Sequence, residues 1–171
     1  GINWARIDGY SKDHQDYPLD SILYNNTPFH AIWGTSSNNF YLVGATGKII
    51  HWDGVKGNEV YGENDINLTE VSGYDENCIL ETDTNSQPRL AIKYDGYKWE
   101  AITGLNYNIQ YYGCYVVSPK EYYISGAKIY RYFNDEWQEV VGDSLGMKID
   151  IKGDMETGEI VAVGRANTIL H

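Results

Sequence analysis

The feature that most constrains this chain is an internal repeat. The pattern of Trp, two residues, Ile or Val, one residue and Gly occurs three times, beginning at Trp4, Trp99 and Trp137. A degenerate fourth copy begins at Gly57, where glycine stands in the tryptophan position. Successive copies are 53, 42 and 38 residues apart. Such a chain is expected to fold as an array of similar units, each burying its apolar surface against its neighbours.

Three further strand-like segments precede the motif in each unit. The first segments are 30–34, 68–73, 111–116 and 148–153, the second are 40–44, 78–81, 122–126 and 159–164, and the third are 49–52, 91–94, 129–132 and 168–171. Asp53-Gly54 and Asp95-Gly96 follow two of the third segments. Asp-Gly between alternating runs is a strong hairpin signal, because glycine accepts the positive φ that the turn needs. Each unit therefore predicts four short antiparallel strands.

Units of four strands and about 40 residues predict the blades of a β-propeller. We expect an all-β fold of four four-stranded antiparallel blades, forming a single domain over residues 1–171. The last unit reaches His171 without a fourth strand, whereas residues 4–9 are a fourth strand without the other three. The N-terminal strand is therefore expected to close the last blade, which would remove open sheet edges. The alternative is a four-blade segment of a larger propeller.

One segment carries a resemblance to known repeats. The sequence Ala-Ile-Trp-Gly-Thr-Ser-Ser-Asn-Asn-Phe-Tyr-Leu-Val-Gly-Ala-Thr-Gly-Lys-Ile-Ile-His-Trp-Asp-Gly, residues 31–54, resembles bacterial propeller repeats of the photosystem-assembly-like and Asp-box-like types. Residues 159–171 are similar to the start of that repeat and residues 90–104 to its end. The resemblance implies a β-propeller over most of the chain apart from residues 10–28. It implies no particular activity, because propellers host many functions.

The net charge of the chain limits the classes of partner that it is expected to bind. Thirteen Lys and Arg residues against 24 Asp and Glu residues leave a net charge of −11. This balance argues against nucleic acid and anionic membrane surfaces, which proteins bind through basic patches. No apolar run approaches the ~18 residues of a membrane span, so no membrane insertion is expected. We expect an acidic protein that is secreted or lies at a bacterial cell surface.

Two long connections are expected on one face of the propeller. Residues 10–28 join a fourth strand to the next first strand, and the 82–89 loop joins a second strand to a third, so both lie at the same strand ends. Insertions on one face of a repeat array often mark its binding face. Tyr107, an aromatic residue in another loop, is added to the candidates. The candidate ligand-binding residues are His14, Asp16, Tyr17, Tyr24, Asn26, Asp83, Asn85, Arg89 and Tyr107. The alternative is that these are surface loops without a partner.

Two carboxylates are expected near the propeller axis. Aligning the first strands places Ala31, Glu70, Gly113 and Asp150 at equivalent positions. Glu70 and Asp150 would then face the central channel as a glycosidase pair or a cation site. The alternative is a pair of solvated channel carboxylates. We assign no catalytic residue, no metal ligand and no cofactor.

Other residues are expected to serve packing. The repeated tryptophans Trp4, Trp99 and Trp137 fill the space between tapering blades. Cys78 and Cys114 lie in apolar strands and are expected to be buried thiols. The alternative is a disulfide between them, which requires their β-carbons to face each other. The predicted function is therefore a non-enzymatic binding module for a protein or peptide. A lectin-like glycan binder is the second reading and a glycoside hydrolase the third.

Overall fold

The computed structural model describes residues 28–62, 66–83, 91–106, 108–141, 146–154, 156–165 and 168–171. Regular structure within these ranges consists of β-strands joined by turns. None of the described residues belongs to a helix with the length and apolar character needed to cross a membrane.

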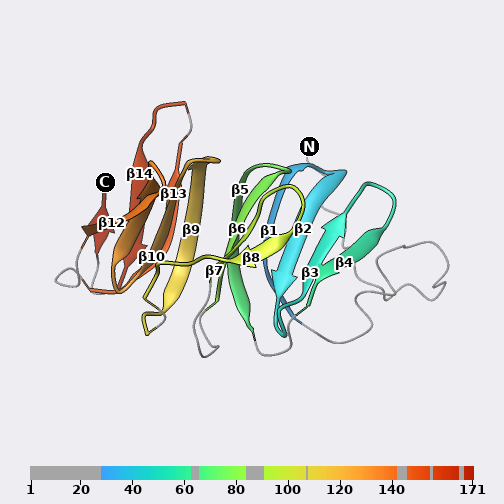
Figure 1. Ribbon diagram of the computed structural model, residues 1–171, viewed down its shortest axis with the longest axis horizontal. Coiled ribbons are helices and arrows are strands. Elements are labelled where there is room, and N and C mark those ends of the chain that lie inside the picture. The colour runs from blue at the N-terminus through green and yellow to red at the C-terminus, as the bar shows by residue number, and fades with distance from the viewer. Residues whose placement is uncertain are drawn as a thin grey trace, which may run out of the picture.

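The strands form four separate antiparallel sheets, each in chain order (Figure 1). Blade 1 contains β1 (Phe29–Ser36), β2 (Asn39–Gly44), β3 (Ile49–Trp52) and β4 (Gly57–Tyr61). Blade 2 contains β5 (Leu68–Asp75), β6 (Cys78–Asp83), β7 (Ala91–Tyr94) and β8 (Trp99–Ala101). Blade 3 contains β9 (Tyr111–Ser118), β10 (Glu121–Gly126), β11 (Ile129–Phe133) and β12 (Glu136–Val141). Blade 4 contains β13 (Lys148–Gly153), β14 (Ile160–Gly164) and β15 (Ile169–Leu170).

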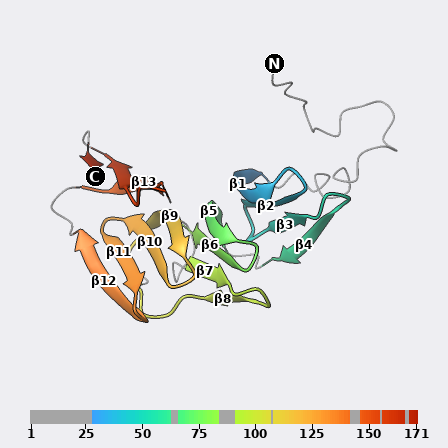
Figure 2. The ribbon, with the colours of Figure 1, turned by 90° about the horizontal axis from the view of Figure 1, so that it is seen from above.

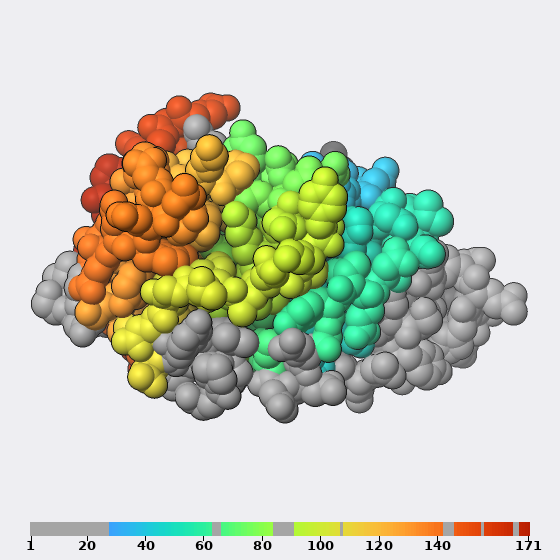
Figure 3. All heavy atoms as spheres, viewed as in Figure 1, coloured from blue at the N-terminus to red at the C-terminus, as the bar shows by residue number. Residues whose placement is uncertain are grey.

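The blades stand side by side in an open arc. Their first strands are innermost, where β1 packs on β5, β5 on β9 and β9 on β13. Figure 2 shows blade 1 at one end of the arc and blade 4 at the other. The predicted all-β propeller fold is confirmed. Figure 3 shows the same order as adjoining bands of surface, from cyan through yellow-green to orange.

Closure of the ring within the chain is not seen. A closed ring of four blades would bring β13 against β1, but these strands belong to the two ends of the arc (Figure 2). Blade 4 has three strands among the described residues, and the segment predicted to complete it, residues 4–9, lies outside them. The arrangement is that of the alternative prediction, a four-blade segment of a propeller.

The repeat register holds at the level of single residues. Ala31 pairs with Val43, Glu70 with Thr82, Gly113 with Ser125 and Asp150 with Val163, in each case just after an irregularity in the pairing of the two inner strands. The alignment of the four first strands predicted from the sequence is therefore confirmed. Equivalent positions in different blades have side chains on equivalent faces, because side chains alternate along a strand.

The hydrophobic core lies between the blades. Tyr41, Val43 and Ile49 of blade 1 pack with Ile79 and Ile92 of blade 2. A second cluster fills the space between blades 2 and 3, and a third lies between blades 3 and 4. Blades 2 and 3 thus each contribute one face to the interface with the preceding blade and the other face to the interface with the following blade.

The repeated tryptophans pack where the sequence predicts. Trp99 of blade 2 contacts Tyr41 and Tyr61 of blade 1, with ring centroids 6.3 Å apart in both pairs. Trp137 of blade 3 donates its Nε1–H to the carbonyl of Thr103, which follows blade 2, at 3.0 Å. Interblade packing is therefore confirmed for these two residues, whereas Trp4 lies outside the described residues.

Candidate functional site

Most residues of the predicted insertion face lie outside the described part of the chain: His14, Asp16, Tyr17, Tyr24, Asn26, Asn85, Arg89 and Tyr107. Asp83 is described and is fully buried. Its Oδ1 accepts a hydrogen bond from the backbone N–H of Asn67 at 3.1 Å. The Asp83 carboxylate therefore supports the entry into β5. The remainder of the insertion face stays a prediction.

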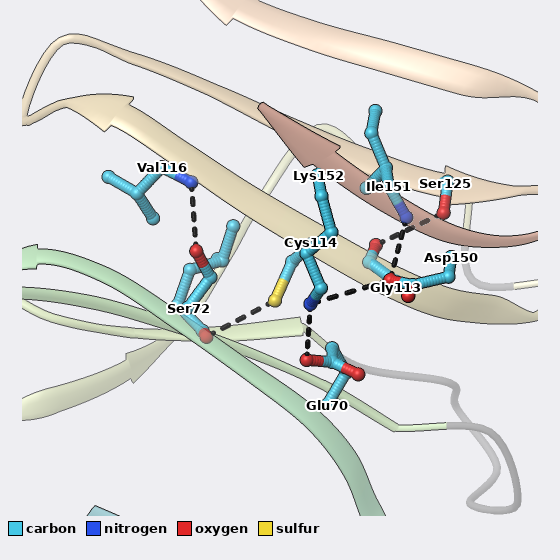
Figure 4. Close-up of polar contacts among 10 residues, drawn as sticks. Glu70, Ser72, Gly113, Cys114, Val116, Ser125, Asp150, Ile151 and Lys152 are labelled. Carbon is cyan, nitrogen blue, oxygen red and sulfur yellow. Dashed lines mark hydrogen bonds and ion pairs between the residues drawn. The ribbon is translucent and has the colours of Figure 1, made fainter. Parts of the chain in front are cut away.

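The two predicted axial carboxylates meet at a lysine. Lys152 Nζ lies 2.8 Å from Glu70 Oε1 and 3.4 Å from Asp150 Oδ1 (Figure 4). Glu70 belongs to blade 2, and Asp150 and Lys152 belong to blade 4, so the contact spans the innermost strand of blade 3. Gly113 on that strand permits the approach, because a Cβ there would lie 3.0 Å from the Asp150 Cα.

The electrostatics of this axial cluster of Glu70, Asp150 and Lys152 favour ion pairing. Burial lowers the pKa of Lys152, but the hydrogen bond to Glu70 and the charges of Glu70 and Asp150 outweigh it, so the pKa is raised overall. An ammonium thus occupies the position that a cation bound by the two carboxylates would take. No group of three or more potential ligands that could hold a metal ion occurs among the described residues.

Lys152 was missed by the sequence analysis. It follows Asp150 by two positions on β13, so strand alternation places both side chains on one face. That alternation is the signal that would have found it. A glycosidase pair uses one carboxyl as proton donor and the other as nucleophile or base. The Lys152 ammonium contacts both carboxylates and so occupies the space between them, where a glycosidase would place the bond to be cleaved.

Short polar contacts beside the axial cluster tie the inner strands together (Figure 4). Ser72 Oγ accepts a hydrogen bond from the Val116 N–H at 3.1 Å, and the Cys114 thiol donates to the Leu80 carbonyl at 3.3 Å. Burial raises the pKa of the Cys114 thiol well above its ordinary value, with the charge of Glu70 adding to the effect. Cys78 and Cys114 are both buried and free, as predicted.

A groove between blades 1 and 2 is the other candidate site. It consists of two adjoining hollows of about 490 and 390 Å³ that share Tyr41, His51 and Tyr94. The larger hollow is further lined by Val60, Tyr61, Tyr97, Lys98 and Trp99. The smaller is further lined by Asn38, Asn39, Asp53, Glu76 and Asn77. We call these two hollows the blade 1–2 groove.

The turns of blades 1 and 2 place the polar end of the groove. Asn38 and Asn77 lie in the turns that join the first and second strands, and Asp53 lies at the turn between β3 and β4. Asp53 Oδ1 accepts hydrogen bonds from the N–H groups of Val55 and Lys56, both at 2.9 Å. These turns are at the strand ends opposite to those that carry the 10–28 and 82–89 connections. The sequence analysis did not single out this edge.

Aromatic rings form the floor of the groove. The rings of Tyr41 and His51 stack at 4.4 Å, as paired residues of β2 and β3. Tyr94 and Trp99, paired between β7 and β8, lie 5.1 Å apart. Burial raises the pKa of Tyr41 to about 12, with smaller contributions from Tyr94 and nearby carboxylates. Its hydroxyl therefore remains protonated near neutral pH.

A chain of hydrogen bonds orders the polar end. Asn39 Nδ2 donates to Glu76 Oε2 at 3.1 Å, which leaves Asn39 Oδ1 to face His51 Nε2 at 2.7 Å. Because an amide oxygen only accepts, the His51 Nε2 must donate. Burial lowers the pKa of His51, although the charges of Asp53 and Glu76 oppose the effect. The groove thus combines preordered aromatic, amide and carboxylate groups, which suits the binding of a ligand.

Comparisons with known proteins establish the fold alone. No protein-family model and no curated protein sequence matches the chain. Among solved structures, YCF48 bound to D1 peptide shares 18% identity at a TM-score of 0.61, covering 81% of this chain and 47% of that one. A nidogen/laminin complex shares 15% identity at 0.63, covering 81% and 57%. The WD40 β-propeller domain of Doa1 shares 13% identity at 0.66, covering 82% and 49%. The chain therefore spans about half the length of these proteins.

Proposed function

We propose that this chain is a non-enzymatic binding module that holds a peptide segment of a protein partner in the blade 1–2 groove. The observation that carries the proposal is the continuous floor of Tyr41, His51, Tyr94 and Trp99 beside the ordered amide and carboxylate groups of Asn39 and Glu76. Aromatic rings supply contact area at low entropic cost, and a few fixed polar groups give orientation.

The charge of the groove indicates the kind of peptide. Glu76 and Asp53 line its polar end, close to the rings of Tyr41 and Tyr94. A lysine or arginine side chain placed there would meet carboxylates and the faces of tyrosine rings, both of which attract cations. The net charge of −11 adds a field that draws basic partners toward the chain. We therefore propose a peptide with at least one basic side chain.

The comparisons support a binding role without identifying the partner. Two of the similar structures are YCF48 bound to D1 peptide and a nidogen/laminin complex, so propellers of this kind occur in complexes with peptide or protein. The face that carries the 10–28 and 82–89 loops remains a separate proposed surface for a protein or peptide. A secreted or cell-surface location likewise remains a proposal.

A random-sequence peptide array, printed beside a glycan array, tests the proposed function. We expect selective binding to peptides that contain Lys or Arg, weakened by salt because exposed charges are screened. Tyr94→Ala should weaken binding by about tenfold or more, as for an aromatic residue at the centre of an interface. Glu76→Gln should reduce the preference for basic residues.

Tyr74→Ala is the matched control, because Tyr74 is an exposed tyrosine that does not line the groove. It should bind as the unmodified chain does. Binding to glycans alone would replace the peptide proposal with the lectin-like reading. Peptide binding that is insensitive to both groove substitutions would move the site to another surface.

A further inference from the structure

Blade 2 extends one lysine across its interface with blade 3. Lys93 Nζ lies 4.9 Å from the centroid of the Tyr122 ring on β10. The same ammonium donates a hydrogen bond to the carbonyl of Pro119, in the turn between β9 and β10, at 3.2 Å. A cation is attracted both to the face of an aromatic ring and to a carbonyl oxygen. The blade 2–3 interface therefore holds a lysine ammonium between a tyrosine ring and a turn of blade 3.

The repeat places His51 at the position of Lys93. Each is the third residue of the third strand of its blade, β3 in blade 1 and β7 in blade 2. His51 stays on its own blade, where its ring stacks on Tyr41 at 4.4 Å and its Nε2 bonds Asn39 Oδ1 at 2.7 Å. Because the histidine does not cross to blade 2, the smaller hollow of the groove, about 390 Å³, lies where Lys93 would cross between blades 2 and 3.

Glu76 occupies in the groove the position that Pro119 occupies in the blade 2–3 interface. Each is the first residue of the turn between the first two strands of its blade. The turn that faces the hollow therefore carries a carboxylate, whereas the turn that receives Lys93 offers a carbonyl. Tyr94 supplies the neighbouring ring, since Glu76 and Tyr94 both line the smaller hollow. An ammonium at this place would meet a negative charge as well as an aromatic face.

The carboxylates of the groove are arranged for a lysine rather than an arginine. Glu76 Oε2 accepts a hydrogen bond from Asn39 Nδ2 at 3.1 Å, and none of the described residues donates to Glu76 Oε1. Both oxygens of Asp53 accept hydrogen bonds from groups of its own blade. A guanidinium binds best to both oxygens of one carboxylate, whereas an ammonium is a compact point charge. A single uncommitted oxygen therefore suits lysine.

We propose that the blade 1–2 groove selects a lysine side chain of its partner, with the ammonium held between the Glu76 carboxylate and the Tyr94 ring. This selectivity rests on the proposed function of the groove and narrows the basic side chain to lysine. Lys93 makes the chain's own form of the same contact, one interface further along the arc. The equivalent place in the groove is open to a partner because His51 remains on blade 1.

Nuclear magnetic resonance titration with capped single amino acids tests this selectivity on the full chain. The probes are N-acetyl-lysine N-methylamide and its arginine counterpart, followed at the side-chain amide signal of Asn39, which is bonded to Glu76. We expect the lysine probe to shift this signal with a dissociation constant on the order of millimolar, as befits a ligand of this size. The arginine probe should bind at least about fivefold more weakly, because it lacks a carboxylate with two uncommitted oxygens.

The His51→Lys variant tests whether the chain's own lysine can take the place of the partner's. The introduced side chain has the strand position of Lys93 and should reach Glu76, so we expect the response to the lysine probe to be lost. Tyr74→Lys is the matched control, because it adds the same charge at an exposed residue that does not line the groove. It should bind the lysine probe as the unmodified chain does.

Three outcomes overturn the selectivity for lysine while leaving a peptide groove in place. The first is an arginine probe that binds as tightly as the lysine probe. The second is a His51→Lys chain that responds as the unmodified chain does, or a Tyr74→Lys chain that loses the response equally. The third is a lysine probe that leaves the Asn39 signal unmoved while array peptides still bind in a Tyr94-dependent way. If neither the probe nor any peptide binds, the proposed function fails as well.

Discussion

At the scale of single residues, Glu81 is the least expected feature of the core. It is fully buried on β6, and neither of its carboxyl oxygens has a hydrogen-bond partner. Leu42 and Ile124 occupy the equivalent position in blades 1 and 3. Burial raises the pKa of Glu81 well above its ordinary value, so the folded chain holds this group as the neutral acid.

Replacing Glu81 should stabilise the fold. As pH rises above the ordinary value of 4.5, the unfolded chain loses the Glu81 proton while the folded chain keeps it. The free energy of unfolding therefore falls with rising pH until the raised pKa of the folded state is passed. We expect Glu81→Leu to remove this fall and to gain about 1–3 kcal/mol at neutral pH, since an unsatisfied buried polar group is lost. Urea unfolding across a pH series measures both effects.

Glu81→Gln is the matched control, because glutamine keeps the shape and polarity but does not titrate. It should flatten the pH dependence without the full gain of the leucine variant. A Glu81→Leu chain whose stability follows the same pH profile as the unmodified chain would contradict the account.

At the scale of elements, close packing of neighbouring inner strands sets where glycine is required. A Cβ on Gly73 of β5 would lie 2.6 Å from the ring of Trp33 on β1. The equivalent pair in blades 3 and 4 is Tyr115 against Gly153, where a Cβ would also collide with the ring. The inner strands thus approach through an aromatic ring laid on a glycine between blades 1 and 2 and between blades 3 and 4. Between blades 2 and 3 the equivalent residues are Ser72 and Val116, which are joined by a hydrogen bond.

We expect Gly73→Ala to destabilise the chain by about 1–3 kcal/mol, because the added methyl group displaces a ring held between two blades. Thermal unfolding followed by near-ultraviolet circular dichroism measures the loss and reports the Trp33 environment. Gly62→Ala is the control, since a Cβ there meets only the end of the Glu59 side chain, at 2.9 Å. Equal stability of the two variants would show that the aromatic contact is not constraining.

At the scale of the whole molecule, the axial cluster links parts of the arc that are far apart in the sequence. Lys152 of blade 4 contacts Glu70 of blade 2, 82 residues away. It also lies between two carboxylates that would repel each other without it. The ion pair is partly exposed, so its contribution to stability is modest.

Lys152→Met should lower the free energy of unfolding by about 1 kcal/mol or less, which is the range for exposed ion pairs. The deficit should shrink in about 1 M salt, where the Debye length is about 3 Å and repulsion between Glu70 and Asp150 is screened. Chemical unfolding in urea at low and high salt measures it. Lys152→Arg keeps the charge and should behave as the unmodified chain. If the free energy of unfolding lost in Lys152→Met does not change with salt, the loss comes from packing of the lysine side chain and not from its charge.

Much of the fold follows from the sequence, because short local patterns within each repeat predict the strands and turns. Turn residues such as Asp95-Gly96 and alternating apolar runs depend on neighbours along the chain, so they define strands and their order. The repeat period also places Glu70 and Asp150 at equivalent positions of their strands. The burial of Cys78 and Cys114 follows from their apolar strands in the same way.

The tertiary structure decided what depends on contacts between blades. Lys152 between two carboxylates, Tyr41 beside Trp99 and the unsatisfied Glu81 each involve residues from separate repeats, whose meeting no local pattern encodes. The predicted closed ring and the observed open arc differ for the same reason. The spacing from Trp137 to Trp4 is compatible with a ring, but the curvature of the arc is set by side-chain packing at each interface. The sequence alone thus determines the blades and their register, whereas packing between them determines the open arc and its groove.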